Sequence, residues 1–208
     1  MPINRRTFVA GTAALGAASL IGSRPADAAI LSVEEAMERR YIGSEDAPVN
    51  IMEFFSLGCP HCRAFHEETL PILKQEYIDT GKVRFEFRDY PLGIKATAAA
   101  MITRCAPANR YTGLVELMFR SQAQWAQVND TLPPLKQVAK FGGLSGEDVD
   151  ACLNKSDLLE AMRTRAESDS EEYDINSTPS FYIVESEQKI EGAQPVEAFR
   201  QAIDAILN

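Results

Sequence analysis

The sequence predicts an α/β fold with a long helical insertion, and three features support this prediction. A nearly continuous apolar run, residues 49–55, leads into a turn that ends in a Cys-x-x-Cys pair. A helical pattern and a strand of alternating apolar residues, 83–88, come next and complete a β-α-β unit with parallel strands. Residues 93–176 then show helical patterns and no convincing strand, before two short strands and a closing helix. We therefore expect one sheet whose two halves are separated by helices.

The first 28 residues have the features of a cleaved export signal. Arg5 and Arg6 begin a positively charged region, a weakly apolar stretch rich in Ala and Gly follows, and residues 25–28 offer an A-x-A cleavage site. The stretch is short for a membrane span, so we expect cleavage rather than a retained anchor. The paired arginines resemble a twin-arginine signal, but Asn4 departs from its commonest form. The twin-arginine and the general secretory routes both remain open.

A short helix is expected next. Ser32 can cap it, Glu34 and Glu35 in its first turn suit the positive end of the helix dipole, and we expect it to continue through Arg40. A loop over residues 43–48 separates this helix from the apolar run, which we expect to be a central strand buried on both faces.

The turn after the central strand predicts a reactive thiol. Pro60 has a fixed φ that suits the first turn of a helix, so it places Cys59 at the helix N-terminus. A thiolate there faces unpaired backbone N–H groups and the positive end of the helix dipole, which both lower the pKa of Cys59. His61 can add a hydrogen bond or a charge to the same sulfur. Cys62 lies one turn inside the helix, so we expect it to be the less accessible, resolving cysteine.

Three other kinds of site use a Cys-x-x-Cys pair. A structural zinc site needs about four ligands, and neither Cys105 nor Cys152 belongs to a second such pair. A c-type haem site needs His directly after the second cysteine, where this chain has Arg63. A purely structural disulfide would not need a strand, a turn and a helix that begins with proline. We therefore favour a redox-active disulfide, with no metal and no other cofactor.

The helix that follows the cysteines is expected to run to about Tyr77. Pro71 lies inside it and should kink it, because proline lacks the N–H group of a helical hydrogen bond. His66 lies four residues after Cys62, beside Glu67 and Glu68, and we expect it to be a solvated helix residue.

Helical patterns fill the segment between the two halves of the sheet, at residues 95–105, 113–122, 133–141, 146–153 and 157–172. Cys105 and Cys152 lie in this segment at apolar helical positions. Export favours a structural disulfide between them, and two buried free thiols are the alternative. Beyond it, residues 180–184 and 188–191 are expected to be strands, and residues 195–207 the closing helix.

Glu-Phe-Phe at residues 53–55, Cys-Pro-His-Cys at the turn and Thr178-Pro179 far downstream form a distinctive combination. Together they resemble the DsbA-type thiol:disulfide oxidoreductases of the thioredoxin superfamily. The resemblance implies a thioredoxin fold with an inserted α-helical domain, and oxidation of newly exported proteins. We expect the thioredoxin-fold domain at residues 29–92 and 177–208, and the inserted domain at residues 93–176, where it would help to shape a groove for extended chain.

The same resemblance implies roles for three residues. Glu53 matches a buried acid that helps proton transfer to and from the inner cysteine; a pairing with Arg84 or Arg88 is the alternative for a lone acid in an apolar strand. Thr178 and Pro179 match a cis-proline pair that offers its backbone edge to the substrate, and an ordinary trans proline that opens a strand is the alternative. The best-known oxidase has Val before this proline; Thr is more usual in disulfide isomerases and in some other DsbA-like proteins.

The function that we expect is an exported, periplasmic dithiol oxidase that donates the disulfide between Cys59 and Cys62. Its partners would be unfolded or thiol-containing exported proteins and a membrane redox partner that reoxidises it. The net charge of −9 argues against nucleic acid and anionic membranes as partners. We expect a monomer, because known periplasmic isomerases of this fold carry an added dimerisation domain, and here only about twenty residues separate the export signal from the first strand. The alternatives are a disulfide isomerase or reductase, and a chaperone-like module that binds unfolded chains.

Overall fold

A mixed five-stranded sheet forms the centre of the molecule, with strand order β1-β3-β2-β4-β5. The coordinates are a computed structural model that describes residues 30–208, so the expected export signal lies outside the described residues. The strands are β1 (Arg40–Ile42), β2 (Val49–Phe55), β3 (Val83–Asp89), β4 (Ser180–Ile183) and β5 (Gln188–Glu191). β2 pairs in parallel with β3 and antiparallel with β4, which places the strand before the cysteine turn in the middle of the sheet.

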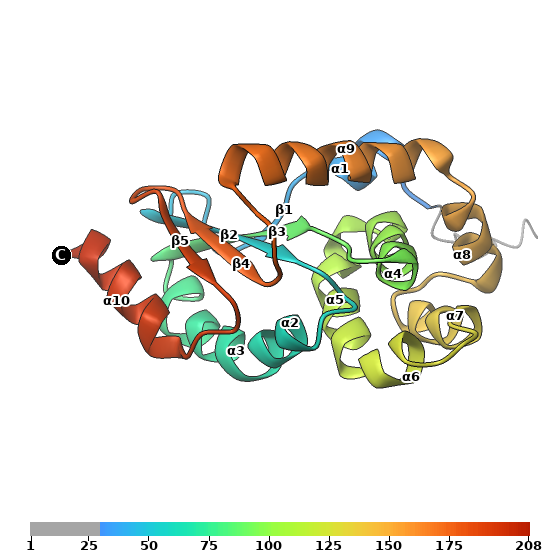
Figure 1. Cartoon of the computed structure of the whole chain (residues 1–208), viewed down its shortest axis with the longest axis horizontal. Helices are drawn as coiled ribbons and strands as arrows, with labels where there is room; N and C mark the ends of the chain where they lie inside the picture. The colour runs from blue at the N-terminus through green and yellow to red at the C-terminus, as the bar shows by residue number, and fades with distance from the viewer. Residues whose placement is uncertain (1–29) are drawn as a thin grey trace, which may run out of the picture.

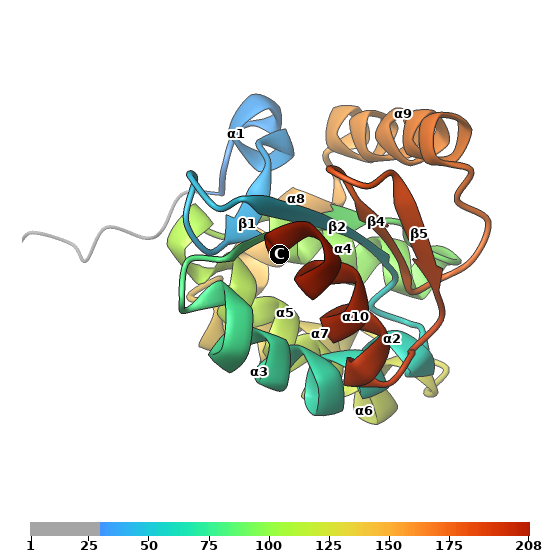
Figure 2. The ribbon, with the colours of Figure 1, turned by 90° about the vertical axis from the view of Figure 1, so that its left-hand side faces the viewer.

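Helices cover both faces of this sheet (Figure 1). α1 (Val33–Met37) and α9 (Ser156–Tyr173) lie on one face. The opposite face carries α10 (Val196–Leu207) and the helix that begins at the cysteine turn, as the view along the sheet also shows (Figure 2). Every residue of β2 from Ile51 onward is buried, which is the pattern of a strand covered on both faces.

The first strand was not expected from the sequence. The prediction of a helix from Ser32 through Arg40 is correct only at its start, where Ser32 and Glu35 form a capping box. α1 ends at Met37, and Arg40 instead pairs with Phe87 of β3. The Arg40 side chain is buried and donates to the carbonyl oxygen of Glu35 at 2.7 Å. Pairing with the sheet edge therefore overrides the local helical pattern.

The helix after the cysteines changes its hydrogen-bond pattern along its length. It consists of α2 (Pro60–Ala64), η1 (Phe65–Thr69), α3 (Leu70–Leu73) and η2 (Lys74–Ile78), and we call residues 60–78 the active-site helix. η1 and η2 are π-helical, with bonds such as the one from the Leu70 N–H to the Phe65 carbonyl. Pro71 lies between them; it has no N–H group, and its ring crowds the preceding turn, which favours such irregular turns.

Between β3 and β4 the chain is helical. The helices are α4 (Ile94–Cys105), the short η3 (Ala108–Arg110), α5 (Tyr111–Arg120), α6 (Gln122–Ala126), α7 (Leu132–Phe141), α8 (Gly146–Leu153) and α9. α4 to α8 gather at one end of the sheet (Figure 1). One apolar core runs from Phe85 and Phe87 of the sheet to Met118 and Trp125 of these helices. The division into two domains stays a prediction.

A disulfide joins the last residue of α4 to α8. It links Cys105 to Cys152 across a sequence separation of 47 residues, and both residues are fully buried. A covalent link of this kind limits the conformations of the unfolded chain, so it stabilises the folded state.

We expect replacement of this disulfide by Cys105→Ala and Cys152→Ala to lower the free energy of unfolding by up to about 4 kcal/mol. Urea unfolding of the oxidised parent and of the double variant measures the loss. The single variant Cys105→Ala is the matched control, because it already lacks the bond and should account for most of the effect. Equal urea midpoints for parent and double variant would contradict the expectation.

Candidate active site

Cys59 is the N-cap residue of α2, with Pro60 at the first helical position. Its sulfur is half-buried, and the thiol donates to the carbonyl oxygen of Thr178 at 3.3 Å. The pKa of Cys59 is lowered to about 5, chiefly by a hydrogen bond from the Cys62 thiol and then by the Thr178 side chain and by the backbone N–H groups of Cys62 and His61. These donors stabilise a negative charge on this sulfur, which is the condition that favours nucleophilic attack by a cysteine.

Cys62 has the opposite environment. It is fully buried, and the backbone N–H of Ser56 donates to its sulfur at 3.5 Å. Burial raises the pKa of the Cys62 thiol, and the hydrogen bond with Cys59 and the negative charge of Glu53 raise it further. One sulfur of the pair is therefore acidic and accessible, while the other is held protonated inside the protein.

His61 contributes to the turn through its backbone. Its N–H group lies at the Cys59 sulfur and helps to lower the pKa of that thiol, while the residue itself is exposed. A role for the His61 imidazole, as donor or as charge, stays a prediction.

Glu53 and His66 form a buried pair, and the charge of Glu53 acts on the pKa of Cys62. Glu53 is fully buried in β2, and its two carboxylate oxygens lie 3.1 and 2.9 Å from His66 Nε2. The arginines suggested as its partners bind elsewhere: Arg88 pairs with Asp169 at 2.9 Å, and Arg84 lies over the Tyr41 ring.

The expectation that His66 is a solvated helix residue is therefore wrong. Its side chain is only 3% exposed. Four residues separate it from Cys62, and side chains at this spacing lie on the same face of a helix. Because Cys62 was expected to point inward, His66 on the same face of the helix could have been predicted to be buried as well. The prediction of a solvated residue followed the neighbouring glutamates instead.

Thr178 and Pro179 lie across the turn from the cysteines, and the peptide bond between them is cis. The Thr178 carbonyl faces the Cys59 sulfur, and the Pro179 carbonyl accepts a hydrogen bond from the Gly192 N–H at 2.8 Å. This fixes the start of β4 beside the Cys59 sulfur. The trans alternative weighed for this proline is wrong.

The helices between β3 and β4 also hold the turn, through residues that the sequence did not single out. Gln122 of α6 is buried, and its Nε2 donates to the carbonyl oxygens of Leu57 at 2.7 Å and Cys59 at 3.0 Å. A Cβ added to Gly58 would lie 3.1 Å from the Ala96 Cβ of α4, so only glycine fits there without displacing a neighbour. A lone Gln within a helix carries no recognisable signal, because its carbonyl partners lie more than sixty residues away in the sequence.

Metal ligands do not gather at the turn. Among residues 30–208 there is no group of three or more His, Cys, Asp or Glu side chains that could hold a metal ion.

Known proteins with similar sequences are named for disulfide chemistry. Relatives with similar sequences include a putative protein-disulfide oxidoreductase of Rickettsia typhi, 29% identical over 143 residues, and disulfide bond formation protein D of Bacillus subtilis, 26% identical over 150 residues. Each match covers 68% of this chain; it covers 53% of the Rickettsia protein and 66% of the Bacillus protein. The chain thus spans about half the length of the Rickettsia relatives it matches.

Solved structures give the same result for the fold. The crystal structure of Wolbachia pipientis alpha-DsbA1 is 26% identical, has a TM-score of 0.75 and covers 82% of this chain and 91% of its own. Oxidised BdbD of Bacillus subtilis, 23% identical with a TM-score of 0.70, shares the fold over 86% of this chain and 97% of its own. The sequence model described as thioredoxin matches residues 35–205, which is well over half of the chain. The chain therefore belongs to the thioredoxin family, in the form of that fold found in DsbA-type oxidoreductases.

Proposed function

We propose that this protein is a dithiol-disulfide oxidoreductase that donates the disulfide between Cys59 and Cys62 to thiol-bearing exported proteins. The observation that carries the proposal is the contrast between the two sulfurs. The pKa of Cys59 is lowered to about 5, while burial raises the pKa of Cys62. A thiolate stabilised in the reduced protein makes reduction of its disulfide favourable, so the oxidised protein is a strong oxidant.

The reaction has two exchange steps. A substrate thiolate attacks the Cys59 sulfur, the bond between Cys59 and Cys62 breaks, and Cys62 leaves as a thiolate that takes up a proton. A second substrate thiolate then attacks the substrate sulfur of the mixed disulfide and releases Cys59 as a thiolate. Two electrons pass from the substrate thiols to the enzyme pair. A redox partner, which we propose to be membrane-bound, accepts them when the pair is reoxidised.

The surface around the turn suits an extended or unfolded substrate. The backbone at Thr178 and Pro179 lies beside the Cys59 sulfur, where a substrate chain could pair with it. Leu92 and Ile94, at the start of α4, are 54% and 86% exposed, and the Leu92 N–H donates to Ser56 Oγ of the turn at 3.1 Å. Large apolar side chains left in solvent near this turn are suited to contact unfolded protein.

Export to the periplasm is part of the proposal. It rests on the signal-like residues 1–28 and on the buried disulfide between Cys105 and Cys152, since such bonds form and persist in oxidising compartments. None of the helices in residues 30–208 is long and apolar enough to cross a membrane.

The test is the equilibrium of the Cys59–Cys62 pair with glutathione, followed by alkylation and mass spectrometry in the Cys105→Ala, Cys152→Ala background. We expect a disulfide far more oxidising than the glutathione pool. A redox potential near or below that of the glutathione pool would indicate a reductase or an isomerase rather than an oxidase. Cys59→Ala should abolish disulfide transfer to a reduced, unfolded protein; a variant that still protects unfolded chains as well as the parent would indicate a binding module instead.

A further inference from the structure

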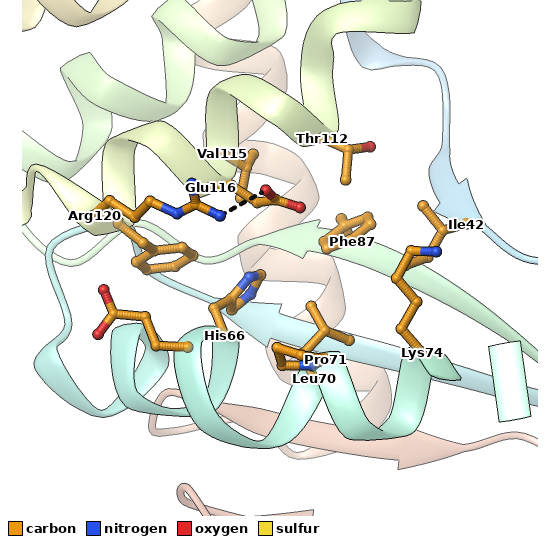
Figure 3. Close-up of a pocket in the computed structure, with 12 residues that line it drawn as sticks. Ile42, His66, Leu70, Pro71, Lys74, Phe87, Thr112, Val115, Glu116 and Arg120 are labelled. Carbon is orange, nitrogen blue, oxygen red and sulfur yellow. Dashed lines mark hydrogen bonds and ion pairs between the residues drawn. The ribbon is translucent and has the colours of Figure 1, made fainter. Parts of the chain in front are cut away.

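A cavity of about 350 Å³ lies between the active-site helix and α5 (Figure 3). Its wall is mainly apolar and includes Leu70, Phe87, Val115 and Phe119. Charged side chains from both elements stand around it: Glu67 and Lys74 from the active-site helix, and Glu116 and Arg120 from α5. The volume is enough for several water molecules.

His66 is the buried titratable group in the wall of this cavity. Its Nε2 contacts the Glu53 carboxylate at 2.9 Å, and its Nδ1 is buried without a hydrogen-bond partner among the described residues. The imidazole lies between the active-site helix and α5, among the residues that line the cavity (Figure 3). One ring nitrogen thus faces the buried acid, and the other is enclosed beside the cavity without a polar partner among the described residues.

We propose that His66 relays protons between Glu53 and water in this cavity, and so supplies and removes the proton of Cys62 during disulfide exchange. The inference rests on the proposed function and deepens it, because it identifies the route by which a buried thiol exchanges its proton with solvent. Glu53 is the acid that the sequence predicts for this proton transfer. Its hydrogen-bond partner in this chain is His66, which also lines the cavity.

The steps balance in both directions. When a substrate thiolate attacks Cys59, Cys62 leaves as a thiolate. His66 gives its Nε2 proton to the Glu53 carboxylate while its Nδ1 takes one from water that enters from the cavity, and Glu53 passes the proton on to the Cys62 thiolate, so that one proton crosses the ring. During reoxidation the same groups carry the proton of Cys62 outward, before its thiolate attacks the mixed disulfide. Imidazole is suited to this exchange because its ordinary pKa lies near neutrality.

Glu53 is the carboxylate that bonds to His66, and the charged side chains around the cavity pair with other residues. From the active-site helix, Glu67 lies near Arg63 at 3.8 Å and Lys74 pairs with Asp79. From α5, Glu116 pairs with Arg120 at 3.5 Å. Four aromatic rings also lie around the imidazole, with centroids 4.3 to 6.1 Å from it: Phe55, Phe65, Phe87 and Phe119. The imidazole is therefore shielded from bulk water except through the cavity.

The test measures the reactions of the two sulfurs as separate kinetic steps. Reduced protein is mixed with oxidised glutathione, and stopped-flow fluorescence with acid quenching follows first the mixed disulfide at Cys59 and then its closure by Cys62. His66→Gln keeps an amide N–H that can donate to Glu53 but cannot pass a proton. We expect it to slow the Cys62 step by about 10- to 100-fold at neutral pH and to remove the pH dependence that the imidazole confers. The alkylation rate of Cys59 should not change. Glu68→Gln, exposed on the same helix and away from the cavity, is the matched control.

Two further variants make the result decisive. Glu53→Gln with His66→Gln should be no slower than Glu53→Gln alone, because both residues lie on one route; additive slowing would overturn the relay. Thr112→Phe leaves the buried pair intact and narrows the cavity from α5, so it should slow the same step even if His66→Gln does not fold. The relay is also overturned if folded His66→Gln or folded Thr112→Phe closes the disulfide through Cys62 at the parent rate. It is equally overturned if the alkylation rate of Cys59 falls by the same factor as the Cys62 step. If the parent chain itself forms no disulfide with glutathione, the proposed function fails instead.

Discussion

Alkylation of the reduced protein by iodoacetamide is expected to titrate with a midpoint near pH 5, at Cys59. The hydrogen bond from Cys62, followed by the Thr178 side chain and the helix N–H groups, stabilises the thiolate, so the sulfur should be almost fully ionised and reactive at pH 7. Mass spectrometry after short exposure across a pH series measures the profile. Cys59→Ser is the control, and it should show almost no modification because Cys62 is buried and its pKa is raised. A midpoint above pH 8 would contradict the structure.

The same shift predicts how stability depends on pH. A thiol whose pKa is lower in the folded than in the unfolded state contributes stability above its unfolded pKa, and the contribution is lost as pH falls through the folded value. This contribution exists only in the reduced protein, since a disulfide does not titrate. We therefore expect the reduced form to be more stable than the oxidised form at pH 7, and the difference to shrink as pH falls toward 5. Urea unfolding of both forms at pH 7 and pH 4.5 measures it; a constant difference would contradict the expectation.

Replacement of Arg104 by Ala is expected to cost the fold about 3–5 kcal/mol. Arg104 is buried at the end of α4, where its Nε donates to Asp89 Oδ2 at 2.5 Å. Its Nη1 donates to the Glu38 carbonyl at 2.8 Å, and its Nη2 to the Phe87 carbonyl at 3.3 Å. The side chain thus joins α4 to β3 and to the chain before β1, and its removal leaves the Asp89 carboxylate buried without its partner.

Chemical denaturation measures this loss, with Arg120→Ala as the matched control. Arg120 forms an exposed pair with Glu116, so its removal should cost less than about 1 kcal/mol. Adding Asp89→Asn to Arg104→Ala should recover part of the stability, because the uncompensated charge is then gone. A loss for Arg104→Ala no larger than that of the control would show that the buried network contributes little.

Local patterns in the sequence were sufficient where an element is determined by its own residues. The central strand was expected at residues 49–55 and is found there, and the helices expected at 95–105, 133–141 and 146–153 differ from the observed ones by at most one residue at each end. The last two helices begin with a proline in the first turn and with a Ser145 cap, respectively, and in all these segments local preference and burial agree. The edge strand β1 has only three residues, and the sequence did not predict it. So short a segment shows no apolar period of its own, and it forms a strand because it pairs with β3.

The sequence by itself determined the cysteine turn: a strand, two cysteines and a proline within a few residues specify a partly exposed sulfur at a helix N-terminus, and these relations are local. Only the tertiary structure decided what surrounds it. Gln122 reaches the turn from α6, Thr178 from the start of β4, and His66 joins Glu53 across the space between a helix and a strand. These contacts depend on how distant segments pack, and a single polar residue among many gives no sign in the sequence of which buried partner it will meet.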